Sequence, residues 1–135
     1  MAGQVASPKL LGYWRSSASW RVRIALALKE AGYEYVPVHL LGGEQKTESY
    51  TKLNPMAQVP TFITAEGVSL TQSLAIIEYL EETLHSGQPL LPSDPIQRAH
   101  ARAFAEMINS GVQPLQNLSV LLYAQFFFVL HSFPS

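Results

Sequence analysis

The chain has 135 residues, which fits one domain or one domain with part of another. Hydrophobic residues make up 47% and charged residues 14%, which excludes a disordered chain, and a net charge of −1 argues against a large cationic surface for nucleic acid or anionic membranes. Cysteine is absent, which excludes disulfides, thiolate nucleophiles and cysteine-ligated zinc. The first residues lack the pattern of a secretory signal. We therefore expect a soluble, cytoplasmic protein, and a mitochondrial pool stays open.

The N-terminal part of the sequence predicts a strand, a helix and a second strand. Lys9–Tyr13 is a short, mainly apolar run typical of a strand, and Trp20–Ala31 is rich in alanine, leucine and arginine, as expected of a helix. Gly32 is placed to end this helix, and the aromatic and β-branched residues of Tyr33–Leu40 predict another strand. Because a helix joins the strands, we expect a parallel pair with a right-handed crossover.

The next residues predict a short polar helix reaching Lys52, then a hairpin and an amphipathic helix. Val59–Thr64 and Val68–Leu70 flank a turn signal and predict antiparallel strands. Ser73–Leu84 has an apolar stripe at helical spacing with acidic residues off it: Leu74, Ile77, Leu80 and Leu84 against Glu78, Glu81 and Glu82. The predicted fold class is α/β, a thioredoxin-like domain with the order β-α-β-α-β-β-α.

The C-terminal part predicts a separate helical segment. We expect a first domain over residues 1–87, a proline-rich linker over 88–93 and helices over 94–135, where Asp94-Pro95 is typical of a helix start. Small or apolar residues at positions 99, 103, 107 and 111 predict a packing seam. No charged residue follows Glu106, and the run Leu121–Leu130 is apolar but too short to span a bilayer.

Three places in the sequence could bind an anion or a peptide. Ser16–Ser19 precede the first predicted helix, where free backbone N–H groups and serine hydroxyls could stabilise a thiolate or simply cap the helix. Thr71–Ser73 precede the later helix and could bind a carboxylate or likewise cap it. Val59-Pro60 lies before a strand, where the peptide bond could be cis and present its backbone to a ligand, or an ordinary trans bond.

Other polar residues give weaker signals. Gln113, Gln116, Asn117 and Ser119 interrupt an apolar run and could line a cleft or face water. The histidines at positions 39, 85, 100 and 131 lack the spacing of metal ligands, so we expect no metal. Tyr13, Trp14 and Trp20 are expected to be packing residues.

Four segments, in order along the chain, resemble zeta-class glutathione transferases, the family of the maleylacetoacetate isomerases. They are Tyr13–Leu26 (YWRSSASWRVRIAL), Asn54–Thr61 (NPMAQVPT), Gln72–Leu80 (QSLAIIEYL) and Val112–Ser119 (VQPLQNLS). The resemblance covers about residues 9–121, with a shortened loop at 41–48. It implies a thioredoxin-like domain followed by a fragment of an all-helical domain.

The resemblance also implies glutathione as the cofactor. Ser16 and Ser17 correspond to the catalytic serines, and the Ser16 hydroxyl would stabilise the glutathione thiolate. Val59 would bind the cysteinyl unit through its backbone, before a cis Pro60, and Gln45 would lie beside the glycyl end. Gln72 and Ser73 would hold the γ-glutamyl carboxylate. The full set of implied glutathione-binding residues is Ser16, Ser17, Ala18, Ser19, Trp20, Arg21, Gln45, Val59, Gln72, Ser73, Gln113, Asn117, Leu118 and Ser119.

The implied reaction is the glutathione-dependent cis–trans isomerisation of maleylacetoacetate to fumarylacetoacetate in tyrosine and phenylalanine breakdown. Conjugation of glutathione to α-haloacids is the related activity. The substrate bears carboxylates, for which Arg15 or Arg21 is the expected partner. At position 18 the family commonly has cysteine, and Ala18 should weaken rather than abolish the chemistry because glutathione brings its own thiol.

The resemblance stops near Leu121, and we expect a C-terminally truncated form with a tail unlike the family. Family members are homodimers, and we expect this chain to self-associate. The alternative function is that of a catalytically impaired isoform that keeps a glutathione-binding thioredoxin-like domain. A further alternative, membrane association, is suggested only by the apolar tail, which lacks the length and flanking basic residues of a span. No nucleic-acid partner is expected.

Overall fold

The computed structural model describes residues 6–131, and their side chains as far as residue 127. The chain forms two compact units, Met1–Leu90 and Leu91–Ser135, each of which is considered by itself. The division falls inside the proline-rich segment at 88–93.

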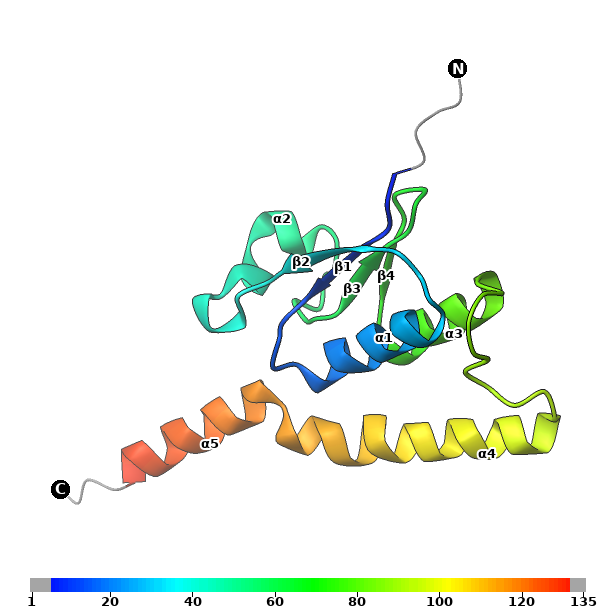
Figure 1. Ribbon diagram of the computed structural model, residues 1–135. Coiled ribbons are helices and arrows are strands. Elements are labelled where there is room, and N and C mark those ends of the chain that lie inside the picture. Colours follow the sequence, from blue (N-terminus) through cyan, green and yellow to red (C-terminus); the bar gives the residue numbers. More distant parts are fainter. Residues whose placement is uncertain (1–5, 132–135) are drawn as a thin grey trace. The chain divides into compact units, whose positions relative to one another are not determined.

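The first unit contains a four-stranded mixed sheet in the order β2-β1-β3-β4 (Figure 1). Its strands are β1 (Lys9–Gly12), β2 (Glu34–Pro37), β3 (Thr61–Ile63) and β4 (Ser69–Thr71). β1 runs parallel to β2, and β3 is antiparallel to both β1 and β4. The parallel pair and the hairpin are as the sequence predicts, and the arrangement is thioredoxin-like.

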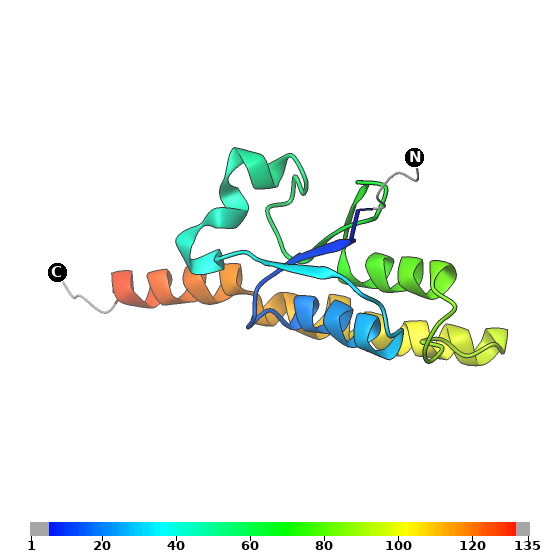
Figure 2. The ribbon, with the colours of Figure 1, turned by 45° about the horizontal axis from the view of Figure 1, so that its top comes forward.

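Helices cover both faces of this sheet (Figure 2). α1 (Ser17–Leu28) and α3 (Ser73–Thr83) pack against each other on one face, and the other face is covered by η1 (Leu40–Gly42), η2 (Glu44–Lys46) and α2 (Glu48–Thr51). Because side chains alternate along a strand, neighbouring residues of β1 enter different clusters. Leu10 packs with α1, β3 and α3, whereas Leu11 packs with Tyr50 of α2.

Several predicted boundaries and faces are wrong. α1 begins at Ser17 rather than Trp20, because Ser16 caps it, and it ends at Leu28 rather than Ala31. Glu30 takes a left-handed backbone with φ 53°, so the helix ends before Gly32 is reached. β3 begins only after Pro60, which has no N–H to contribute to a sheet. In α3 the predicted Leu80 is fully buried, and so is Ile76, which was not in the predicted stripe.

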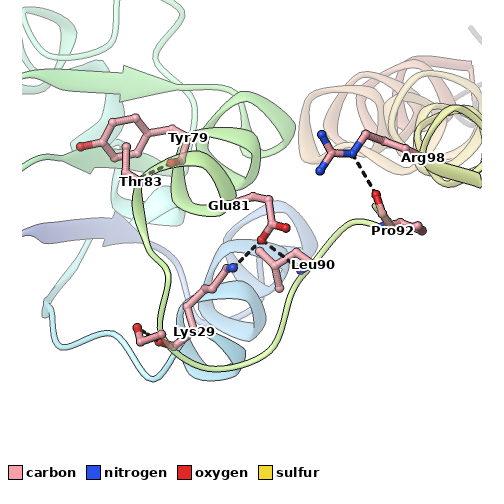
Figure 3. Close-up of polar contacts among 8 residues, drawn as sticks. Lys29, Tyr79, Glu81, Thr83, Leu90, Pro92 and Arg98 are labelled. Carbon is pink, nitrogen blue, oxygen red and sulfur yellow. Dashed lines mark hydrogen bonds and ion pairs between the residues drawn. The ribbon is translucent and has the colours of Figure 1, made fainter. Parts of the chain in front are cut away.

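A buried ion pair joins the ends of α1 and α3 (Figure 3). Lys29 Nζ lies 2.5 Å from Glu81 Oε2, and the two side chains are only 5% and 12% exposed. The same Glu81 oxygen accepts a hydrogen bond from the Leu90 N–H at 3.0 Å, and the Lys29 carbonyl accepts one from Ser86 Oγ at 2.7 Å. The connector 84–90 is thus fastened to both helices, and Glu81, which lies off the predicted apolar stripe, is a buried ion-pair partner.

Close backbone contact also fixes this connector. Gly87 has φ +66°, and a Cβ built on it would lie 2.1 Å from the Leu28 carbonyl oxygen. Both facts require glycine at this position. The N–H of the next residue, Gln88, donates to that Leu28 carbonyl at 2.8 Å, so the connector satisfies an otherwise unpaired group at the end of α1.

The second unit is helical. It contains α4 (Pro95–Glu106), a π-helical turn (Met107–Val112), a 3₁₀ turn (Gln113–Gln116) and α5 (Leu118–His131). As predicted, Asp94 caps α4: its Oδ1 accepts from the Gln97 N–H at 2.8 Å, and Arg98 Nε donates to the Pro92 carbonyl at 3.0 Å (Figure 3).

Two features of the second unit bear on the apolar tail. The predicted seam at positions 99, 103, 107 and 111 is exposed, and regular α-helix stops at Glu106, before the last two of these positions. The run Leu121–Leu130 lies in α5, so the β-prone character of its aromatic residues does not decide its structure. Among residues 6–131, no helix has the length and apolarity needed to cross a membrane.

Candidate glutathione-type anion and thiol site

The N-terminus of α1 carries donors suited to an anion. Ser16 is the N-cap, and its Oγ accepts a hydrogen bond from the Ser19 N–H at 3.1 Å. The first helical hydrogen bond runs from the Trp20 N–H to the Ser16 carbonyl at 2.9 Å, so the N–H groups of Ser17 and Ala18 precede it. The first turn contains no acidic residue to neutralise the positive end of the helix dipole. Ser16 therefore caps the helix while its own hydroxyl hydrogen stays able to donate.

The other residues indicated in this segment differ in accessibility. Ser17 is exposed and Ala18 is half-buried, whereas Ser19 is fully buried. Ser19 Oγ accepts from the Tyr13 N–H at 3.4 Å and lies close to Gly12, where any Cβ would come within 3.1 Å of it. Ser19 thus ties α1 to the end of β1, and its hydroxyl supports the loop instead of facing a ligand.

The two tryptophans of the loop are not core residues. Trp14 is 66% exposed and Trp20 is 48% exposed, so the expectation that they are packing residues is wrong. Trp20 Nε1 donates to the Trp14 carbonyl at 2.8 Å and closes the loop that carries Ser16. The Arg23 guanidinium lies 4.2 Å from the Trp20 ring centroid, which holds this indole against the outer side of α1.

The N-terminus of α3 forms a second donor site, linked to the first by Arg21. Ser73 is the first residue of α3, is only 5% exposed, and its Oγ accepts from Arg21 Nη1 at 3.1 Å. Because a guanidinium only donates, the Ser73 hydroxyl must direct its own hydrogen elsewhere. Burial lowers the pKa of Arg21, yet a guanidinium remains a cation at neutral pH. The simple-capping alternative for Ser73 is wrong, since the N-cap position belongs to Gln72.

Gln72 has a strained backbone at this position. Its φ of 70° and ψ of 116° are unusual for a residue other than glycine, and its side chain makes no capping bond. Instead, its Nε2 donates to Met56 Sδ at 3.3 Å. As with α1, no acidic residue lies in the first turn of α3, so an external anion would meet the uncompensated helix end.

A buried network holds the loop that leads to Pro60. Tyr50 Oη donates to the Gln58 carbonyl at 2.6 Å and lies 3.0 Å from Thr61 Oγ1. Asn54 Nδ2 donates to the same carbonyl at 2.7 Å. Burial raises the pKa of Tyr50, and the bonds with Thr61 and Asn54 lower it in part. The Val59-Pro60 peptide bond is cis. The sequence gives no role to Tyr50; Asn54 and Thr61 are the ends of the segment Asn54–Thr61 that resembles the family.

Gln45 lies in η2 and is buried, and its Oε1 finds no hydrogen-bond donor in the described part of the chain. A buried amide oxygen without a partner is uncommon and costly. The loop around it is fixed by His39, whose N–H donates to Glu44 Oε2 at 2.6 Å and whose Nδ1 accepts from the Gly42 N–H at 2.7 Å. Gln45 is thus a rigidly held, unsatisfied acceptor.

The remaining indicated residues belong to the second unit. Gln113 begins the 3₁₀ turn and is half-buried, as are Asn117 and Leu118, while Gln116 and Ser119 are exposed. The Asn117 carbonyl accepts from the N–H groups of Val120 and Leu121, so this residue starts α5. No group of metal-ligating side chains occurs within the described residues.

Comparison with known proteins places these features in one family. Residues 6–82 match the family described as glutathione S-transferase, N-terminal domain. The chain is 60% identical over 114 residues to a probable maleylacetoacetate isomerase of Caenorhabditis elegans, covering 84% of this chain and 52% of that protein. It is 56% identical over 120 residues to the maleylacetoacetate isomerase of Mus musculus, covering 87% and 55%. The chain thus spans about half the length of these curated relatives.

Solved structures agree. A maleylacetoacetate isomerase from Methylobacterium extorquens with bound malonate and glutathione is similar at a TM-score of 0.82 and 42% identity, over 93% of this chain and 57% of that one. A maleyl pyruvate isomerase, described as a bacterial zeta-class glutathione transferase, is similar at 0.83 and 40% identity, over 89% and 56%.

Proposed function

The chain belongs to the glutathione S-transferase family, and from this premise we propose that its first unit binds glutathione and lowers the pKa of the glutathione thiol. The observation that carries the proposal is the N-terminus of α1, where Ser16 keeps a hydroxyl hydrogen beside the free N–H groups of Ser17 and Ala18. Donors at a helix start favour a thiolate over a thiol. We further propose that the reaction is the isomerisation of maleylacetoacetate to fumarylacetoacetate, with conjugation of α-haloacids as a related activity.

The donor set fits the groups of glutathione. Its γ-glutamyl carboxylate matches the N-terminus of α3, where the Ser73 hydroxyl is backed by Arg21 at 3.1 Å and the Gln72 amide lies alongside in sequence. Gln45, buried in η2, is the residue that the family resemblance places beside the glycyl end. Val59, before the cis bond, has backbone groups suited to pair with the cysteinyl unit.

When bound, glutathione would supply a thiolate nucleophile for the conjugated double bond of the substrate. The residues of the chain would hold and orient it. Ser16 would donate to the thiolate sulfur and keep it ionised, and the Ser17 and Ala18 N–H groups would add dipolar stabilisation. Arg15, whose guanidinium lies 5.7 Å from the exposed Trp14 ring, is the cation proposed to pair with a substrate carboxylate. Ala18 contributes its backbone N–H but has no side-chain donor, so the side-chain donation would come from Ser16.

The test is the Ser16→Ala variant, which removes the hydroxyl donor. The pKa of bound glutathione, followed by thiolate absorbance, should rise, and turnover of maleylacetoacetate should fall by about 10²-fold, as for loss of one oxyanion-hole donor. Ser17→Ala is the matched control and should have the smaller effect. If the titration and turnover of Ser16→Ala equal those of the natural chain, Ser16 is only a helix cap.

Binding and turnover are measured separately, because they distinguish two functions. Glutathione binding with isomerisation supports the enzyme, whereas binding without isomerisation would identify an impaired, glutathione-binding form. We also propose a homodimer in the cytoplasm with a mitochondrial pool, as the family resemblance implies. Sedimentation velocity and fractionation of cells test these two points.

A further inference from the structure

Met56 lies beside the proposed carboxylate site, and its side chain is exposed to reagents in solution. Its backbone is fixed, because its N–H donates to Asn54 Oδ1 at 3.1 Å and Asn54 is itself buried. Its side chain is 60% exposed, and its sulfur accepts the hydrogen bond from Gln72 Nε2 at 3.3 Å. The thioether is therefore open to small reagents while it contacts a residue of the site.

The composition makes this sulfur a principal target for two-electron oxidants. The chain has no cysteine and three methionines: Met1, Met56 and Met107. Because the chain has no thiolate that would react first, peroxides react with the methionine thioethers. The sulfur gives an electron pair to one peroxide oxygen, the O–O bond breaks, an S–O bond forms, and the other oxygen leaves as water. Sulfur is oxidised by two electrons and hydrogen peroxide is reduced.

We propose that Met56 is a redox modification site, and that its sulfoxide holds the Gln72 amide and lowers the affinity of the chain for glutathione. The inference rests on the proposed function, which gives Gln72 a share in binding the γ-glutamyl carboxylate. A thioether is a weak hydrogen-bond acceptor. In the reduced protein the Gln72 side-chain N–H therefore leaves the Met56 sulfur easily and donates to a ligand instead. A sulfoxide oxygen is a stronger and more polar acceptor, and it competes with the ligand for the same Gln72 N–H.

The contact geometry sets the expected size of the effect. Only one donor of several is withdrawn, since the hydrogen bond from Arg21 Nη1 to Ser73 Oγ at 3.1 Å does not involve Met56. Full loss of one hydrogen bond to a charged group raises a Kd by about tenfold or more, but the sulfoxide only competes for the Gln72 bond, so the expected rise in Kd is about three- to tenfold. Oxidation should therefore weaken glutathione binding without abolishing it.

The experiment treats the full chain with hydrogen peroxide, removes the peroxide with catalase and gel filtration, and titrates the protein with reduced glutathione by calorimetry. Peptide mass spectrometry locates the added oxygen. Met56→Leu should bind glutathione with the affinity of the untreated chain before and after treatment. Met107→Leu is the matched control, because Met107 is 62% exposed but lies in the other unit, and its treated form should lose affinity as the natural chain does.

Two further samples separate oxidation from damage. Met56→Gln places a polar acceptor at the same site and should raise the Kd about threefold or more without oxidant. Methionine sulfoxide reductases should restore the affinity of the treated chain. A Met56 that stays unoxidised, a Kd unchanged by its oxidation, or a loss of affinity that persists in Met56→Leu would overturn the inference alone. Failure of the untreated chain to bind glutathione would overturn the proposed function and this inference with it.

Discussion

The ion pair between Lys29 and Glu81 gives the sharpest test of what stabilises the first unit. Both side chains are nearly fully buried, and their separation of 2.5 Å joins α1 to α3 and to the connector through the Leu90 N–H (Figure 3). Glu81→Gln keeps an oxygen that can accept from that N–H but removes the negative charge. The Lys29 ammonium is then buried without its counter-charge. Removing one partner of a buried ion pair costs about 3–5 kcal/mol.

Urea unfolding followed by tryptophan fluorescence measures this loss in the relevant unit. The only tryptophans, Trp14 and Trp20, both belong to the first unit, so the signal reports its unfolding. Glu48→Gln is the matched control, since its ion pair with Lys52 is 84% and 71% exposed. That change should cost less than about 0.5 kcal/mol, because solvent screens exposed pairs.

A second variant keeps the reasoning testable if Glu81→Gln unfolds the protein. Replacing both members, as in Lys29→Met with Glu81→Leu, removes both charges and fills the space with apolar groups. Buried pairs replaced in this way are often near neutral in stability. The double variant should therefore be more stable than Glu81→Gln. A loss below about 1 kcal/mol for Glu81→Gln, or a double variant less stable than it, would refute the argument that an unpaired buried charge dominates.

Two further predictions concern the proposed site and its supporting network. Ser73→Ala should raise the Kd for glutathione by about tenfold or more, with less effect on turnover at saturation, because it removes binding that the ground and transition states share. Calorimetry measures this Kd, and an unaltered Kd would exclude the carboxylate site. Burial raises the pKa of Tyr50, so its contribution to stability is full below the unfolded value near 10.0 and is lost as pH rises through the higher folded value. Tyr50→Phe should therefore lower the free energy of unfolding by about 1–3 kcal/mol at pH 7 and reduce its further fall above pH 10, as measured by urea unfolding at both values; an unchanged alkaline slope would contradict the assignment.

Local patterns predicted the elements of the fold because they depend on neighbours in sequence. The apolar run at Lys9–Gly12, the cap at Asp94 and the glycine turn before Val68 each depend on a few neighbouring residues, and each appears in the structure. The exact boundaries are harder to predict, because several serines stand near the start of α1 and the sequence does not show which of them is the N-cap. The N-cap is Ser16, so α1 begins three residues earlier than predicted.

Contacts between distant residues could not be predicted. Glu81 has the spacing of a solvated helix face, and only the arrival of Lys29, 52 residues earlier, makes it a buried partner. The bond from Arg21 to Ser73 likewise spans 52 residues, and it changes Ser73 from a presumed cap into an acceptor fixed by a cation. Gln45 is the third case, since its burial depends on the fold of the whole η1–η2 loop. The family resemblance named Ser73 and Gln45, but not the contacts that orient them.

The last prediction concerns α5, whose apolar side chains surround the helix. Val120, Leu121, Leu122 and Tyr123 are consecutive and all exposed, so at about 100° per residue they point in every direction. A helix whose whole circumference is apolar is normally buried on every side. Packing one face of such a helix against one neighbour leaves its other faces exposed to water. We therefore expect the chain to self-associate, with a sedimentation coefficient that rises with concentration. Leu122→Glu, or removal of residues 121–135, should reduce association and leave glutathione binding by the first unit intact. Val68→Glu is the matched control, because Val68 is equally exposed but lies in the first unit, and it should change nothing. A natural chain that sediments as a monomer at micromolar concentration and binds no apolar dye would show that α5 is covered within one chain, and the expectation of self-association would then be wrong.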